Sequence, residues 1–289
     1  MGKELGIGVY YLMAINWTMG ITIIGSFGAA LSAQMAANFF TNRREDKKYD
    51  RECFQSLYSP LSLKIIEYVY LENYKSQIMS GTAFNAESFE QSSENPEPKF
   101  KVIMEYIGRD LKYALPEIIM EYEYLKADVL DFSGDRDFGS RMNFCRMFLL
   151  EYVKLSNKLN VLSKAVEERV IPPLFYSFFY LLLEKCEFWE LIKESMTSLY
   201  LIEKVVLKKD NNNLLDRITA IQHEINYVKE ENVNQHRYEE AFTDAYHFIY
   251  EFIDKCSAVN DYGEEIAKHW REILEKELEY KPFPERILA

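Results

Sequence analysis

No residue is charged from Leu5 to Asn42, LGIGVYYLMAINWTMGITIIGSFGAALSAQMAANFFTN. As an α-helix these 38 positions would extend about 57 Å, at roughly 1.5 Å per residue. The core of a bilayer needs only about 20 predominantly apolar residues. The sequence therefore predicts a transmembrane segment within residues 1–42. We expect the span at about residues 9–31, with the excess length taken up by tilt or by helix beyond the lipid.

Basic residues follow this stretch, whereas only Lys3 precedes it. The basic cluster after it consists of Arg43, Arg44, Lys47 and Lys48. By the positive-inside rule, these positions predict a single-pass protein of the inner cell membrane, with its N-terminus outside and the rest of the chain cytoplasmic. A cleaved signal peptide would be shorter and would carry its basic residues on the other side. A buried core helix would also be shorter.

Small residues repeat at four-residue spacing along the predicted span and so share one face of a helix. They are Gly25, Ala29, Ala33 and Ala37. A second row at the same spacing carries hydroxyl groups, at Thr18, Thr22 and Ser26. Small faces allow helices to pack closely in lipid, so this pattern predicts a homo-oligomer. The alternative is a monomeric span whose hydroxyl groups bond to carbonyls of their own helix.

One helix cannot enclose a pore, so a pore would require several copies around an axis. The hydroxyl row would then line it, and the basic cluster would surround its inner mouth. Rings of Lys and Arg side chains favour anions. The alternative explanation for the basic cluster is a topology signal or a contact with lipid headgroups.

Composition excludes several classes of function. The net charge of −12 argues against a broadly basic surface for nucleic acid, although a local patch remains compatible with it. Only 11 glycines are present, and neither a Rossmann nor a Walker pattern can be written with them. The four cysteines form no C-x-x-C motif and are expected to be reduced, buried thiols.

The rest of the chain predicts an all-α fold, because apolar residues recur three or four apart and glycine and proline are rare. We expect juxtamembrane helices at residues 43–80, a loop at 81–98 and a cytoplasmic helical bundle at 99–289. On the second juxtamembrane helix, 61–79, the expected buried stripe is Leu63, Ile66, Tyr70 and Ile78. The bundle helices are expected at 99–114, 116–132, 140–170, 174–192 continuing toward 209, 214–232, 235–260 and 262–280.

The prolines at 172 and 173 are expected to end the helix that starts at residue 140. The uncharged run at 171–183 has only 13 residues, too few to span a bilayer, which predicts the core helix of the bundle. The alternative is a re-entrant or interfacial helix.

One helix of the soluble part has an excess of positive charge, and it is the candidate ligand surface. Its residues are Arg141, Arg146, Lys154, Asn157 and Lys158. Several donors on one helix could bind phosphate groups of a nucleotide or of a single-stranded oligonucleotide. The alternative is a solvated basic face without a ligand.

Catalytic and metal-binding patterns are not found in the sequence. The four histidines do not form the paired Glu-x-x-His elements of a di-metal bundle, and no hydrolase or kinase signature occurs. We therefore expect no cofactor, no metal site and no enzymatic activity.

The order of features, a short external end, one associating span and a large helical cytoplasmic domain, resembles the membrane effectors of bacterial antiphage defence systems, including the Hailong type. The resemblance lies in architecture along the whole chain and includes no diagnostic motif. It implies an oligomeric channel controlled by an oligonucleotide signal, which a partner nucleotidyltransferase produces. The alternative from another class is a membrane-anchored helical scaffold that binds another protein.

Overall fold

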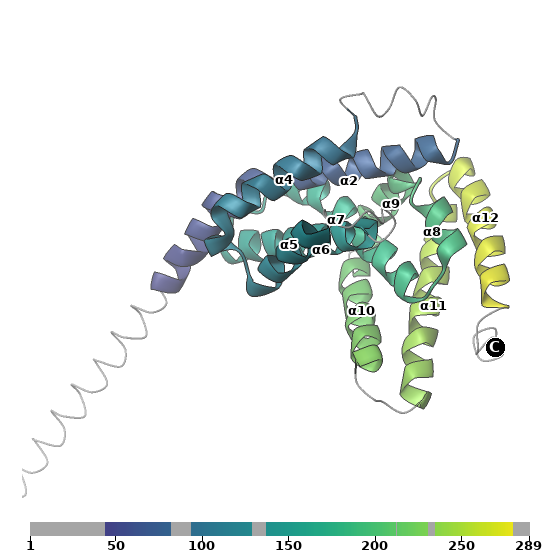
Figure 1. Ribbon diagram of the computed structural model, residues 1–289. Helices are drawn as coiled ribbons and strands as arrows, with labels where there is room; N and C mark the ends of the chain where they lie inside the picture. The colour runs from purple at the N-terminus through teal and green to yellow at the C-terminus, as the bar shows by residue number, and fades with distance from the viewer. Residues whose placement is uncertain (1–43, 82–93, 129–136, 212, 231–234, 280–289) are drawn as a thin grey trace, which may run out of the picture. The chain divides into compact units, whose positions relative to one another are not determined.

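The structure is a computed structural model that describes residues 44–81, 94–128, 137–211, 213–230 and 235–279 (Figure 1). Every regular element in these ranges is a helix, which confirms the predicted all-α class for the described chain. The chain divides into two units between Glu52 and Cys53. All the labelled helices of Figure 1 belong to the second unit.

The described part of the first unit, residues 44–52, is helical. Three members of the predicted basic cluster, Arg44, Lys47 and Lys48, are exposed there. Lys48 Nζ lies 3.9 Å from Glu52 Oε1, one helical turn further on. The pair is solvated on both sides and contributes little to stability.

The second unit begins with a π-helical turn, η1 (Phe54–Tyr58), which leads directly into α2 (Ser59–Met79). The sequence predicts separate juxtamembrane helices, the second at 61–79, but no break occurs before it. Instead the Ser59 amide donates to the Phe54 carbonyl, five residues back. Because Pro60 has no N–H and its ring would clash with the carbonyl four residues earlier, a wider turn lets the helix continue.

The helices α4 (Pro96–Asp110) and α5 (Pro116–Asp128) follow, with the short 3₁₀ turn η2 (Leu111–Tyr113) between them. The Asn95 side chain caps α4 by accepting from the Glu97 amide at 3.0 Å. This cap starts α4 inside the predicted loop at 81–98, and the proline in the first turn fits because its missing N–H would be unpaired there.

The next two helices, α6 (Asp137–Lys158) and α7 (Lys164–Lys185), correct the predicted helix at 140–170. The break lies at residues 159–163, where Asn160 has a left-handed φ of 56° and the Ser163 hydroxyl accepts from the Val166 amide. Pro172 and Pro173 lie inside α7 instead of ending it. The carbonyls that they leave without an amide belong to residues 168 and 169, which are exposed, so water can satisfy them.

Two short helices, α8 (Trp189–Ser195) and α9 (Leu199–Val206), replace the predicted continuation of the core helix toward residue 209. The first break follows Cys186, where Glu187 adopts a positive φ of 60°. The short turn η3 (Lys209–Asn211) ends this region.

The predicted helices of the last third are confirmed to within a few residues. They are α10 (Leu214–Glu230), α11 (Gln235–Ser257) and α12 (Asp261–Leu278). The Asn260 side chain caps α12 by accepting from the Gly263 amide at 2.8 Å. A Cβ at Gly263 would come 2.4 Å from the Cys256 carbonyl oxygen, so the tight turn between α11 and α12 requires glycine here.

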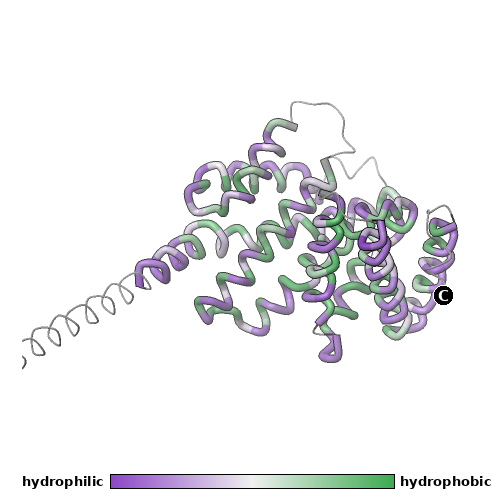
Figure 2. The backbone as a smooth tube through the Cα atoms, turned by 90° about the horizontal axis from the view of Figure 1, so that it is seen from below, coloured by the Kyte–Doolittle hydropathy of each residue, from purple (hydrophilic) through white to green (hydrophobic). Residues whose placement is uncertain are grey.

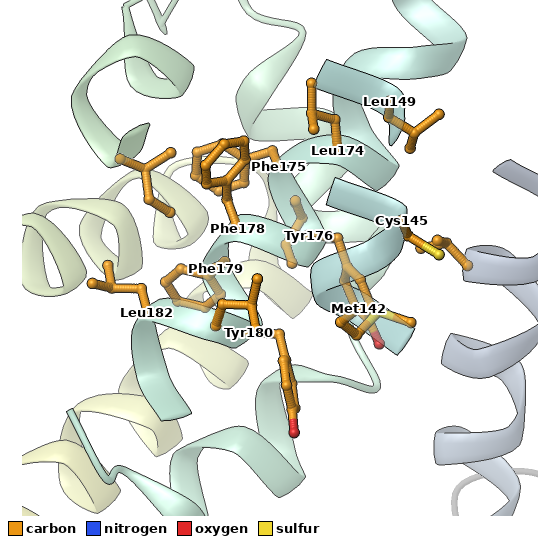
Figure 3. Close-up of a cluster of buried hydrophobic side chains, with 14 of the residues drawn as sticks. Met142, Cys145, Leu149, Leu174, Phe175, Tyr176, Phe178, Phe179, Tyr180 and Leu182 are labelled. Atoms are coloured by element: carbon orange, nitrogen blue, oxygen red, sulfur yellow. The ribbon is translucent and has the colours of Figure 1, made fainter. Parts of the chain in front are cut away.

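The core of the second unit is built around α7, which packs against α2, α6, α8, α9 and α10. All side chains from Pro172 to Leu183 are buried. In Figure 2 green and purple segments alternate along most helices, as expected for helices with one buried and one exposed face. Figure 3 shows the apolar cluster around α7 and the facing residues of α6, including Met142, Cys145 and Leu149. Side chains of α2, among them Leu61 and Ile65, belong to the same core.

No helix among the described residues is both long and apolar enough to cross a bilayer. The uncharged part of α7 is buried within the bundle, as the sequence predicts for a core helix. The predicted span at 9–31, its row of small residues and its row of hydroxyl groups lie outside the described residues.

Candidate functional site

The structure gives two of the predicted ligand residues, Arg141 and Arg146, a role in packing α6. Arg141 Nη1 donates to Glu97 Oε1 at 2.7 Å, and its guanidinium lies 4.6 Å from the centre of the Phe100 ring. Arg146 donates to Asn143 Oδ1 at 2.8 Å. Burial lowers the pKa of Arg146 below its usual value. Arg141 thus joins α6 to α4, whereas the bond of Arg146 stays within α6 and its guanidinium lies 5.2 Å from the centre of the Phe178 ring on α7.

The other three predicted ligand residues, Lys154, Asn157 and Lys158, are exposed at the C-terminal end of α6. Lys154 Nζ lies 3.9 Å from Glu151 Oε2. Arg141 and Lys158 are about 25 Å apart along the helix at ~1.5 Å per residue. The five residues therefore do not form one site, and only the last three share an accessible surface.

A residue that the sequence analysis passed over, Glu72 on α2, is the most unusual ionisable group of the core. Its relative exposure is 2%, although carboxylates are rarely buried without a partner. Tyr68, one turn earlier on α2, is buried beside it, and the cations Lys75 and Arg141 lie in its surroundings. Arg141 and Lys75 both approach Glu97, at 2.7 and 3.9 Å respectively, so Glu72 shares them with a second carboxylate.

Burial is the main cause of the pKa shifts of the ionisable side chains around Glu72. It raises the pKa of the Glu72 carboxyl, while Tyr68, Lys75 and Arg141 act in the opposite direction. The pKa of Tyr68 is raised well above its usual value, first by burial and then by the Glu72 carboxylate. Burial, followed by the effect of Glu72, also raises the pKa of the Cys145 thiol. Glu72 therefore holds its proton more tightly than an exposed glutamate does.

Side-chain amides on α2 join this helix to the turn after α8. The Asn73 side-chain amide donates to the Met196 carbonyl, which also accepts from the Tyr176 hydroxyl at 2.9 Å. One turn further along α2, the Gln77 side-chain amide donates to the Thr197 carbonyl at 2.7 Å. These bonds fix the C-terminal half of α2 against α7 and α8, next to Glu72.

A cavity of about 490 Å³ lies beside Glu72. Residues three or four apart on α2, including Glu72, Lys75 and Met79, form one wall. The remaining walls come from the start of α6, from Tyr180 on α7 and from α8 with the following turn. This volume is within the range of small-molecule sites, and the mixture of apolar walls with a few polar groups is typical of them.

A larger cleft, of about 930 Å³, lies between α10 and α11. Two polar pairs lie within it, since Arg237 Nε lies 2.9 Å from Glu224 Oε1 and His236 Nδ1 lies 3.6 Å from Glu240 Oε1. We therefore consider the Glu72 cavity the better candidate site. Within the described ranges no group of three or more histidine, cysteine or carboxylate side chains is arranged to hold a metal ion.

The sequence contained a signal for Glu72 that the predicted stripe missed. Leu63 and Tyr70 were expected to be buried, but they are 57% and 38% exposed. The predicted Ile66 and Ile78 are buried. The buried face of α2 consists mainly of Leu61, Ile65, Tyr68, Val69 and Glu72. These spacings of three and four also follow the helical repeat, and this alternative stripe ends on a carboxylate.

Comparison with protein-family models, with curated proteins and with solved structures found no match for this chain.

Proposed function

We propose that the chain is a homo-oligomeric membrane effector in which the helices of residues 1–42 form a pore and the helical bundle controls its opening. The observation that carries the proposal is the uncharged run from Leu5 to Asn42 together with its small and hydroxyl-bearing rows and the basic cluster that follows. The run is long enough for a bilayer, and its rows are suited to close contact between copies.

The chain after the run is helical in both units, as far as the end of α2. All residues from 44 to 79 are helical, through the π-turn η1 and into α2. The side chains of α2 belong to the core of the bundle. π-turns inside α-helices are often found at functional positions.

In this proposal the signal is a nucleotide or a single-stranded oligonucleotide that a partner enzyme supplies. Two observations support an anionic ligand of this kind. One is the resemblance in architecture to the effectors of antiphage defence. The other is the exposed group of Lys154, Asn157 and Lys158, which lie within about one helical turn of each other. Two ammonium groups at this spacing can meet adjacent phosphates.

The proposal is tested by ion flux through liposomes that contain the purified, oligomeric full chain. We expect conductance that changes when oligonucleotides are added. Gly25→Leu should reduce the conductance and weaken the oligomer, because a large side chain on the small row prevents close helix packing. Intact oligomers that conduct no ions with or without oligonucleotide would refute the pore.

A second experiment separates the effector from the scaffold, in which the span only anchors the bundle. Reversing the charge of Arg43 and Arg44 to glutamate should shift ion preference from anions toward cations if these residues surround the inner mouth. A scaffold should be insensitive to this change. It should also keep its function when an unrelated Leu-rich helix replaces the span, whereas the effector should lose its conductance.

A further inference from the structure

The apolar and aromatic side chains around the Glu72 cavity indicate which part of a ligand would lie against them. Phe138 and Tyr180 form an edge-to-face pair at its border, with ring centres 4.8 Å apart and planes at 83°. In Figure 3 the Tyr180 hydroxyl points away from the other labelled side chains of the apolar cluster. Ile192 and Met196 add apolar surface. An apolar or aromatic group of a ligand would therefore be accommodated between α6, α7 and α8.

The lysines and the carboxylates on the cavity wall have different partners within the protein. Two lysines lie on the wall, and each approaches a carboxylate outside it: Lys193 Nζ is bound to Glu190 Oε1 at 2.7 Å, and Lys75 Nζ lies 3.9 Å from Glu97 Oε1. The carboxylates on the wall are Glu72, which is buried, and Glu194, whose Oε2 lies 3.8 Å from His269 Nε2. A buried carboxyl beside a cavity gains most from a ligand that brings a positive charge, because the charge compensates the loss of hydration.

We infer that the Glu72 cavity binds a small organic cation, an ammonium group attached to an apolar or aromatic body. The ammonium group lies against the Glu72 carboxylate, and the body packs against Phe138, Ile192 and Met196. Aromatic faces and edges at the border of the site add favourable contacts with the charged group and with the body. The site is separate from the exposed lysines of α6 and uses no residue of the predicted pore.

The test is a series of three probes of similar size and different charge, titrated into the full chain in a neutral detergent. The probes are 2-phenylethylamine, 2-phenylethanol and 3-phenylpropionate. Calorimetry measures their affinities after subtraction of the heats in detergent alone. We expect the amine to bind at least about tenfold more tightly than the alcohol, as for a hydrogen bond to a charged group, and the carboxylate to bind most weakly. Equal affinities, or preference for the carboxylate, would overturn the inference.

A matched pair of variants locates the binding. Glu72→Gln keeps the shape of the side chain and removes its charge, so it should abolish the preference for the amine over the alcohol. Glu67→Gln changes an exposed glutamate of the same helix, bound to Lys99 on the surface, and should leave all three affinities unchanged. An amine preference that survives in Glu72→Gln would refute the assignment.

The probe series requires no variant, so it remains decisive if Glu72→Gln does not fold. The inference and the proposed function fail separately. A chain that binds the amine through Glu72 and conducts no ions keeps the site and loses the pore. A conducting chain that treats the three probes alike keeps the pore and loses the site.

Discussion

Two faces of α7 that are offset by one residue in sequence have different surroundings, one apolar and one polar. Phe175 and Phe179 face α11, where their ring centres lie 5.0 and 4.8 Å from that of Phe252. Tyr176 and Tyr180 are each the next residue in sequence, and their hydroxyls bond to the Met196 carbonyl and to Glu184. The first face is entirely apolar, whereas the second borders the polar region that contains Glu72 and the cavity.

The apolar face of α7 stabilises the bundle, whereas the tyrosine face borders a polar region that lowers the free energy of unfolding. Aromatic side chains that bury their full surface contribute strongly to stability. A buried carboxyl such as Glu72 costs free energy unless its charge is compensated. Retaining such a group beside a cavity is a feature of functional sites.

The largest effect is expected on the phenylalanine face. Phe179→Ala removes a fully buried ring and leaves a cavity next to Phe252, which should cost about 3–5 kcal/mol of unfolding free energy. Urea unfolding followed by near-ultraviolet circular dichroism measures the loss. Tyr124→Ala removes a ring that is 53% exposed and should change stability by less than about 0.5 kcal/mol. Similar losses in both variants would contradict the proposed role of the α7 and α11 rings.

The next effect tests whether Arg141 belongs to the packing or to a ligand surface. Arg141→Met removes the bond to Glu97 and the position over Phe100 while keeping an apolar stem. We expect a loss of about 1–3 kcal/mol, the range for a hydrogen bond to a charged group, because Glu97 stays half exposed and can be hydrated. If the variant keeps its stability and binds oligonucleotide more weakly, Arg141 belongs to the ligand surface and has no packing role.

On the polar side, Glu72 should make stability depend on pH. Since burial raises its pKa, the folded chain retains a proton that the unfolded chain has already lost. The resulting stability is fully present below the pKa of the unfolded carboxyl and is lost as pH rises through the raised pKa, with a slope of at most about 1.4 kcal/mol per pH unit. Urea titrations of wild type and Glu72→Gln across this range should show the variant gaining relative stability with rising pH. Parallel curves would exclude the titration of Glu72.

Tyr176→Phe removes one hydroxyl from the tyrosine face and leaves the ring in place. The Met196 carbonyl then keeps only its bond from Asn73, so we expect a loss of about 1 kcal/mol in unfolding free energy. Amide hydrogen exchange should show faster exchange around α8 and little change around α11. Faster exchange in α11 alone would mean that the two faces of α7 are not energetically separate.

The smallest effect on stability is expected at the exposed end of α6. Lys154→Ala combined with Lys158→Ala should change the unfolding free energy by less than about 0.5 kcal/mol, since both side chains lie at the surface. If these lysines bind an oligonucleotide, the same double variant should weaken that binding and reduce its dependence on salt. A large loss of stability would instead show that the two lysines have a structural role.

Local signals in the sequence predicted most elements of the bundle. The helix predicted at 262–280 is present as α12, where the structure adds Asn260 as its N-terminal cap, and the uncharged run of α7 identified it as the core helix. The break between α6 and α7 was misplaced because two prolines are a strong helix-ending signal. Their acceptance inside α7 depends on the exposure of residues 168 and 169, which the sequence does not reveal.

The candidate site was less predictable than the helices. A search for basic residues on one helix selected Arg141 and Arg146, which the structure uses for packing. Glu72 was missed because two different stripes on α2 follow the helical repeat, and only the partners of α2 determine which of them is buried. Its relation to Tyr180 and to α8 spans more than 100 residues of sequence, so no local pattern predicts it.

The all-α class and most helix positions follow from local patterns in the amino-acid sequence, as does the uncharged N-terminal run with its basic flank. The buried face of α2, the partners of the paired charges and the cavity beside Glu72 follow only from the way the helices pack together. The physical reason is the range of the interactions. Backbone propensities and caps act within one or two turns, whereas burial and pKa shifts depend on side chains that distant helices bring together.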